Sequence, residues 1–71
     1  MTKDFLSKKV GKRIVDLRTE KGLNQSELAR LCAKDRQAIE KIENGKVNPT
    51  IFSLYEVSVA LGVDLHELLN F

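Results

Sequence analysis

The sequence predicts an all-α fold of five short helices, and three observations support this class. Apolar residues recur at the three- and four-residue spacing of amphipathic helices, whereas the alternation typical of half-buried strands is absent. One proline and four glycines in 71 residues are typical of short helices joined by short turns. Because repeats and low-complexity stretches are also absent, we expect a single domain over residues 1–71.

The first two helices are expected at residues 5–20 and 25–32. An apolar stripe at helical spacing marks the core face of the first helix: Leu6, Val10, Ile14 and Leu17. Gly22 follows this segment as a stop signal. Asn24 and Glu27 have the spacing of a capping box, which starts the second helix. The inward positions of the second helix are Leu28, Ala29 and either Leu31 or Cys32.

The third helix is expected at residues 36–43. Asp35 precedes it as a favourable N-cap, because its carboxylate can accept from free backbone amides and opposes the positive end of the helix. Asn44 and Gly45 end it, since glycine readily adopts the left-handed backbone that closes a helix.

The fourth and fifth helices are expected at residues 51–61 and 64–69. A turn at residues 48–50, which contains Pro49, leads into the fourth helix, and Gly62 ends it. Asp64 and Glu67 repeat the capping-box spacing at the start of the fifth. The core face of the fourth helix is expected to contain Ile51, Leu54, Val57, Ser58 and Leu61.

The composition limits the classes of function. A chain this short forms one modest core without a large active-site cavity. Its single cysteine, Cys32, and single histidine, His66, provide neither a disulfide nor a zinc site, so we expect no metal, no cofactor and no catalysis. No apolar run approaches the roughly 20 residues that span a bilayer, and the N-terminus lacks a signal-peptide pattern. We therefore expect a cytoplasmic protein with no membrane partner and no evident small-molecule ligand.

The net charge of +2 is small, but the charges are unevenly distributed. Lysines and arginines are frequent up to Lys46, and none follows Val47. This asymmetry predicts a basic face on the first two thirds of the chain and a different role for the last third.

The second and third helices together match a helix-turn-helix unit at about residues 25–43. They are short, and residues 32–34 with the Asp35 cap form the connection. In the third helix, Ala38, Ile39 and Ile42 share one side. The opposite side carries Arg36, Gln37, Glu40 and Lys41. Arginine can bind guanine bidentately and glutamine can bind adenine in the same way, so this side suits the reading of bases in the major groove of DNA.

The segments Leu23–Ala29, Ile39–Lys46, Pro49 and Ala60–Val63 closely resemble the phage repressor and Cro-type (XRE) helix-turn-helix family of transcriptional regulators. The resemblance spans about residues 10–69 and implies a lambda-repressor-like DNA-binding domain. It places Arg36, Gln37 and Lys41 at base-reading positions. Positions that bind DNA phosphates are matched by Asn24, Gln25, Asn44 and Lys46. The resemblance also implies a structural salt bridge between Arg18 and Glu43.

Two residues depart from the expected pattern. Family members often have glycine where this chain has Ala33, so a left-handed backbone there would cost about 1 kcal/mol unless the turn is built differently. Glu40 lies on the DNA side, where a carboxylate is unfavourable near phosphates unless it has a partner. We expect Glu40 to orient Arg36 or Lys41 rather than to accept a hydrogen bond from cytosine.

The fourth helix carries a second apolar stripe, Phe52, Tyr55 and Val59, beside its core face. The apolar arc then covers roughly 220°, about twice what packing against one core requires. The stripe predicts a homodimer contact, to which Leu69 and Phe71 could add. Alternatively, Tyr55 and part of Phe52 lie at the edge of the monomer core.

The sequence therefore predicts a homodimeric, repressor-like regulator that binds double-stranded DNA in a sequence-specific way and catalyses no reaction. An alternative is a protein-interaction module with the same fold, such as the antitoxin of a toxin pair, in which the second stripe binds a different chain.

Overall fold

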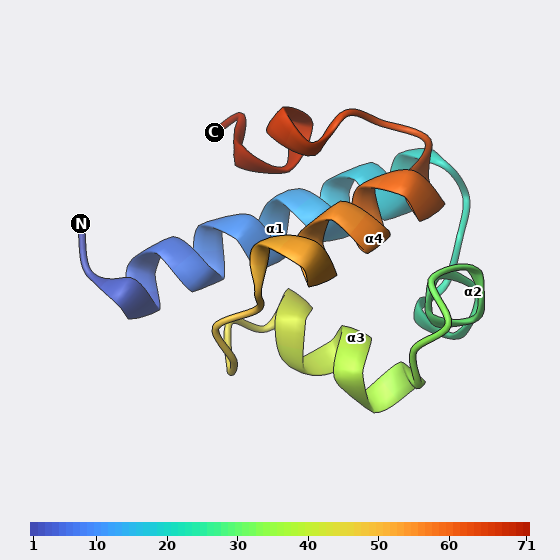
Figure 1. Ribbon diagram of the computed structural model, residues 1–71, viewed down its shortest axis with the longest axis horizontal. Coiled ribbons are helices and arrows are strands. Elements are labelled where there is room, and N and C mark those ends of the chain that lie inside the picture. The colour runs from blue at the N-terminus through green and yellow to red at the C-terminus, as the bar shows by residue number, and fades with distance from the viewer.

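The computed structural model describes all 71 residues, and its regular elements are all helices (Figure 1). The elements are α1 Lys3–Glu20, α2 Gln25–Leu31, α3 Arg36–Glu43, α4 Ile51–Leu61 and the 3₁₀-helix η1 Leu65–Leu69. The all-α class is confirmed, and the first four helices fall within two residues of their expected bounds. The fifth element is a 3₁₀-helix and not the expected α-helix.

The capping box expected at the start of the fifth element does not form. Asp64 makes no side-chain hydrogen bond to the first turn. Backbone bonds instead join residues three apart, from the N–H of Glu67 to the carbonyl of Asp64 and from the N–H of Asn70 to the carbonyl of Glu67. A five-residue segment with one buried side chain, Leu68, has too little packing to fix a regular α-helix, and short pieces of this kind often adopt 3₁₀ geometry.

The N-terminal ends of the α-helices are capped by side chains. The hydroxyl of Thr2 accepts a hydrogen bond from the N–H of Phe5 at 3.1 Å, which explains why α1 begins earlier than expected. The capping box of α2 is complete, with reciprocal bonds of 2.8 Å between Asn24 and Glu27. At α3, Asp35 accepts from the N–H of Ala38 at 2.7 Å.

All four α-helices end with the same pair of backbone hydrogen bonds, a Schellman motif. In α2, Ala33 donates to the carbonyl of Arg30 and Lys34 donates to the carbonyl of Ala29. The closing residue of each motif has a left-handed backbone: Gly22, Ala33, Gly45 and Gly62, with φ of 72°, 56°, 68° and 71°. The turn at Ala33 is therefore left-handed despite its side chain, which costs about 1 kcal/mol.

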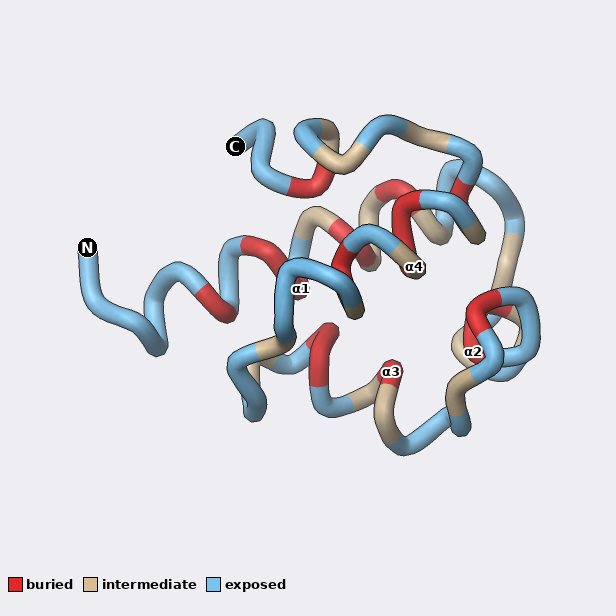
Figure 2. The backbone as a smooth tube through the Cα atoms, viewed as in Figure 1, coloured by how far each residue is buried: buried red, intermediate tan, exposed pale blue.

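The helices enclose one core. Helix α3 packs against α1 and α2, α2 also packs against α4, and η1 closes the core over α1 and α4. Figure 2 shows the buried stretches of the helices facing one another across this interior. The core side chains are Val10, Ile14, Leu17, Leu28, Ala29, Cys32, Ile39, Ile42, Leu54, Val57, Leu61 and Leu68.

Two expected core residues lie outside the core. Ile51 is 71% exposed and Leu6 is 42% exposed, although both continue apolar stripes whose later members are buried. Ile51 opens α4 and Leu6 lies near the start of α1, and both line an open hollow with Leu69 that no side chain fills. At the end of α2, Cys32 is buried and Leu31 is exposed, which decides between the two alternatives.

Candidate nucleic-acid interface

Helix α3 has one buried side and one exposed side. Ile39 and Ile42 are buried in the core. Arg36, Gln37 and Lys41, which we call the reading face, are all exposed. The helix lies at the outer edge of the fold, where Figure 1 shows no other element covering its far side. These side chains are therefore accessible to a large partner.

A chain of hydrogen bonds connects the interior to the reading face. Arg18 contacts Glu43 through two bonds, Nε to Oε2 at 2.6 Å and Nη2 to Oε1 at 3.1 Å. Gln25 donates from Nε2 to Oε1 of Glu43 at 2.8 Å, and its own Oε1 accepts from Nη1 of Arg36 at 3.2 Å. The salt bridge between Arg18 and Glu43 predicted from the sequence is thus present and links α1 to α3.

The partners of Glu40 differ from those expected. Its Oε1 accepts from Nζ of Lys46 at 2.9 Å and from Nδ2 of Asn44 at 3.0 Å. No hydrogen bond joins it to Arg36 or Lys41, so the expectation that Glu40 orients either residue is wrong. The hydrogen bond from Lys46 is the main reason that the pKa of Glu40 lies below its ordinary value of 4.5.

The other two predicted phosphate-binding residues, Asn24 and Gln25, already use part of their side chains in hydrogen bonds within the protein. The Oδ1 of Asn24 caps α2, which leaves its amide nitrogen available. Gln25 uses its oxygen for Arg36 and one amide hydrogen for Glu43. Because a glutamine amide has two donor hydrogens, Gln25 retains one for a ligand.

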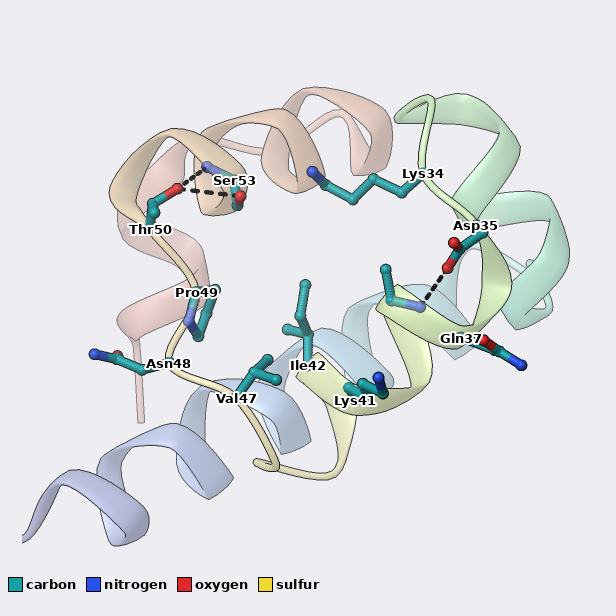
Figure 3. A pocket seen from close by; sticks show the side chains of 11 residues that line it. Lys34, Asp35, Gln37, Lys41, Ile42, Val47, Asn48, Pro49, Thr50 and Ser53 are labelled. Carbon is teal, nitrogen blue, oxygen red and sulfur yellow. Dashed lines mark hydrogen bonds between the residues drawn. The ribbon is translucent and has the colours of Figure 1, made fainter.

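A hollow of about 400 Å³ lies between α3 and the segment that leads into α4 (Figure 3). Gln37 and Lys41 line it from α3, and Asn48 and Thr50 line it from the other side. Thr50 also caps α4 by accepting from the N–H of Ser53 at 3.0 Å. Sequence reasoning missed this polar wall, although the Asn-Pro-Thr turn marks its position.

Lys34 crosses from the turn of the helix-turn-helix unit towards α4 (Figure 3). Its Nζ contacts Oε1 of Glu56 at 2.9 Å, and its side chain is only 18% exposed. This ion pair fastens the start of α3 to α4.

The apolar stripe of α4 is exposed to between half and two thirds: Phe52 66%, Tyr55 51% and Val59 59%. The rings of Phe52 and Tyr55 are neighbours, with centroids 6.3 Å apart. Tyr55 and Val59 line a hollow of about 320 Å³ together with Leu31, which the sequence reasoning did not include. Tyr55 and Phe52 are thus each partly covered, as the alternative position at the edge of the monomer core expects.

The two C-terminal apolar residues of the predicted contact, Leu69 and Phe71, are both exposed. Leu69 lines a separate hollow of about 250 Å³ with Leu6 and Ile51. The structure thus does not bring Leu69 to the hollow beside Tyr55 and Val59.

Groups that could hold a metal are not found. No three side chains among histidine, cysteine, aspartate and glutamate gather at one place. Cys32 is a buried free cysteine, and burial raises the pKa of its thiol. None of the helices combines the length and apolar character needed to cross a membrane.

Two solved structures are similar to this chain over nearly its whole length. The restriction-modification controller protein C.AhdI from Aeromonas hydrophila matches it with a TM-score of 0.91 at 32% identity, over 96% of this chain and 99% of that one. A hypothetical transcription factor from Neisseria matches with a TM-score of 0.88 at 29% identity, over 97% of this chain and 79% of that one.

Sequence comparison leads to the same group. The uncharacterized HTH-type transcriptional regulator y4dJ of Sinorhizobium fredii is 41% identical over 65 residues, which are 92% of this chain and 84% of that protein. The HTH-type transcriptional regulator SinR of Bacillus licheniformis is 42% identical over 62 residues, 86% of this chain and 56% of SinR. The family model described as helix-turn-helix matches residues 14–68. With this match over most of its length, the chain belongs to the helix-turn-helix family of XRE-type, DNA-binding transcriptional regulators.

Proposed function

We propose that this regulator binds double-stranded DNA in a sequence-specific way, with α3 in the major groove. The proposal rests mainly on the two different sides of α3. One side buries two isoleucines, and the other exposes Arg36, Gln37 and Lys41. A major groove about 12 Å wide admits one α-helix, and these side chains suit the edges of guanine and adenine. The act is binding without catalysis, and the cytoplasmic location expected from the sequence is part of the proposal.

The proposed phosphate contacts flank α3. Asn24 and Gln25 lie at the start of α2, and Asn44 and Lys46 lie just beyond the end of α3. Their side chains can donate to phosphate oxygens on either side of the groove. Contacts of this kind fix the position of the protein on any duplex, whereas the reading face selects the sequence.

The reading face is tested by Arg36→Ala. Loss of a bidentate contact to guanine should weaken operator binding by about 1 to 3 kcal/mol and relax the preference at one base pair. The operator is first obtained by selecting bound sequences from a random duplex pool. Unchanged discrimination by Arg36→Ala in a gel-shift series would rule out this assignment.

Arg30→Ala is the matched control. Arg30 is exposed on α2, about 140° around the helix axis from Gln25, and no hydrogen bond from its guanidinium was found. The variant Arg30→Ala removes the same charge as Arg36→Ala, so it reports the non-specific electrostatic effect alone.

Lys46→Ala should weaken binding to all sequences alike and reduce the slope of the salt dependence by about one.

We propose that two copies of the chain associate through the exposed stripe of α4, to which Phe71 adds a contact. An exposed apolar cluster next to a hollow is typical of association sites. Two copies could address half-sites about 34 Å apart on one face of a palindromic operator.

Sedimentation at micromolar concentration tests the association. Wild type should sediment as a dimer, and Phe52→Ala should shift it towards the monomer. A strict monomer for both proteins would contradict the proposed interface. Recovery of a second, different chain with the wild type but not with Phe52→Ala would favour the alternative of an antitoxin or other protein-interaction module.

A further inference from the structure

The Glu40 carboxylate accepts hydrogen bonds from Asn44 and Lys46, the two residues that are proposed to bind phosphate at the end of α3. One oxygen, Oε1, accepts from Nζ of Lys46 at 2.9 Å and from Nδ2 of Asn44 at 3.0 Å. The same Asn44 nitrogen also donates to the backbone carbonyl of Glu40 at 3.0 Å. A single anionic oxygen therefore gathers a lysine and an amide, which is the arrangement that a phosphate oxygen would require.

The backbone holds these groups together. Glu40 and Asn44 are one helical turn apart, so their side chains are neighbours on α3. Lys46 follows the left-handed Gly45, and its N–H bonds the carbonyl of Lys41 at 2.9 Å, so the chain turns back over the helix end. Gly45 also packs closely against the backbone of Lys8, where a side chain would collide. The turn that brings Lys46 to Glu40 is thus fixed by the fold.

We propose that Glu40 is an internal competitor for DNA phosphate, which holds Lys46 and Asn44 in the free protein and must release them when DNA binds. This inference rests on the proposed DNA binding and adds a determinant of affinity to it. A carboxylate oxygen and a phosphate oxygen are both anionic acceptors of charge-assisted hydrogen bonds, so they compete for the same donors. Because every duplex offers phosphates, the competition lowers affinity for all sequences equally.

The size of the effect follows from exposure. The side chains of Lys46 and Glu40 are 59% and 31% exposed, so the pair is a surface ion pair of modest strength. Removing the competing charge should raise affinity for any duplex by about 1.5- to fivefold. The salt dependence should also become steeper, by up to about 0.9 in slope for one additional effective positive charge.

The test compares Glu40→Gln, Glu40→Asp and Asp16→Asn on random-sequence duplex. Glu40→Gln removes the charge, whereas Glu40→Asp keeps the charge but shortens the side chain away from Lys46 and Asn44. Asp16→Asn is the matched control, because Asp16 pairs with Lys12 on the exposed surface of α1 at 2.8 Å. We expect Glu40→Gln to bind most tightly, Glu40→Asp to exceed wild type, and Asp16→Asn to match wild type.

Two outcomes on DNA would overturn the inference. If Glu40→Asp equals wild type while Glu40→Gln binds more tightly, the carboxylate acts by general repulsion and not by holding its partners. If Glu40→Gln raises affinity as much in a Lys46→Ala background as in the wild type, Lys46 is not the group that is released.

A measurement without DNA separates this inference from the proposed function. NMR titration of the Glu40 carboxyl carbon should give a pKa below the ordinary value in the wild type, moving back towards that value in Lys46→Ala. An equal pKa in both proteins would show that the contact is absent in solution and would overturn the competition. Failure of the wild type to bind any duplex, with the pKa difference intact, would instead overturn the proposed function.

Discussion

Replacing Arg18 with alanine should destabilise the fold by about 3 kcal/mol, although Arg18 lies outside the reading face. The Glu43 side chain is 2% exposed and that of Arg18 is 13% exposed, so the substitution leaves a buried carboxylate without its cation. Breaking a buried pair in this way costs about 3 to 5 kcal/mol. The bond from Gln25 remains and places the loss at the lower end of this range. A chain of this length has a total stability of roughly 4 to 11 kcal/mol, so more than a quarter would be lost.

Urea denaturation followed by circular dichroism measures this loss. Arg13→Ala is the control on the same helix, because Arg13 pairs with Glu67 at 3.1 Å in a more exposed setting and should contribute about 1 kcal/mol. The double variant Arg18→Met and Glu43→Leu should regain most of the stability, since no charge is then buried. A loss for Arg18→Ala no larger than that for Arg13→Ala would refute the reasoning.

Three further predictions concern stability. Ala33→Gly should raise the melting temperature by a few degrees because it relieves the left-handed strain, whereas Ala60→Gly within α4 should lower it. Gly11→Ala should unfold at lower urea concentration and bind DNA more weakly, because a methyl group there would collide with the carbonyls of Ile42 and Glu43 at the end of α3; full retention of both properties would contradict this contact. The lowered pKa of Glu40 stabilises the fold above the ordinary value of 4.5, and this contribution disappears as pH falls through the folded-state pKa. Wild type should therefore lose its advantage over Lys46→Ala as pH falls below 4.5, and an advantage that persists at low pH would argue against the ion pair.

Most of the fold could be predicted from local sequence signals such as helix caps. The capping residues Asn24 and Asp35 and the left-handed Gly45 act within one turn of their own helix, so their effects can be predicted without knowledge of the tertiary structure. The errors arise where local and tertiary effects separate. Ile51 continues an apolar stripe but lines an open hollow instead of packing in the core, and Asp64 has a capping spacing but precedes a segment too short for regular α-geometry.

The reading face could be predicted from helical periodicity alone, because Arg36, Gln37 and Lys41 need only lie opposite the buried isoleucines. Their neighbours could not be predicted in this way. Arg36 bonds Gln25, eleven positions earlier in the chain, and Glu40 bonds Lys46 across a chain reversal. Such partners depend on how α2 meets α3 and on the direction in which Gly45 turns the chain, which no spacing rule specifies.

The charge of Glu43 also determines how Arg36 is presented. An ionised carboxylate only accepts, so Gln25 must turn its amide nitrogen towards Glu43 and its oxygen towards Arg36. Glu43→Gln keeps the shape but can both donate and accept, so the amide of Gln25 is free to flip and Arg36 loses its fixed acceptor. We expect the Arg36 Nη–H signal in NMR spectra to broaden in this variant, with weaker operator discrimination, while Arg36→Lys in the same background should lose little more. An Arg36 signal as sharp in Glu43→Gln as in wild type would show that the buried carboxylate does not control the reading face.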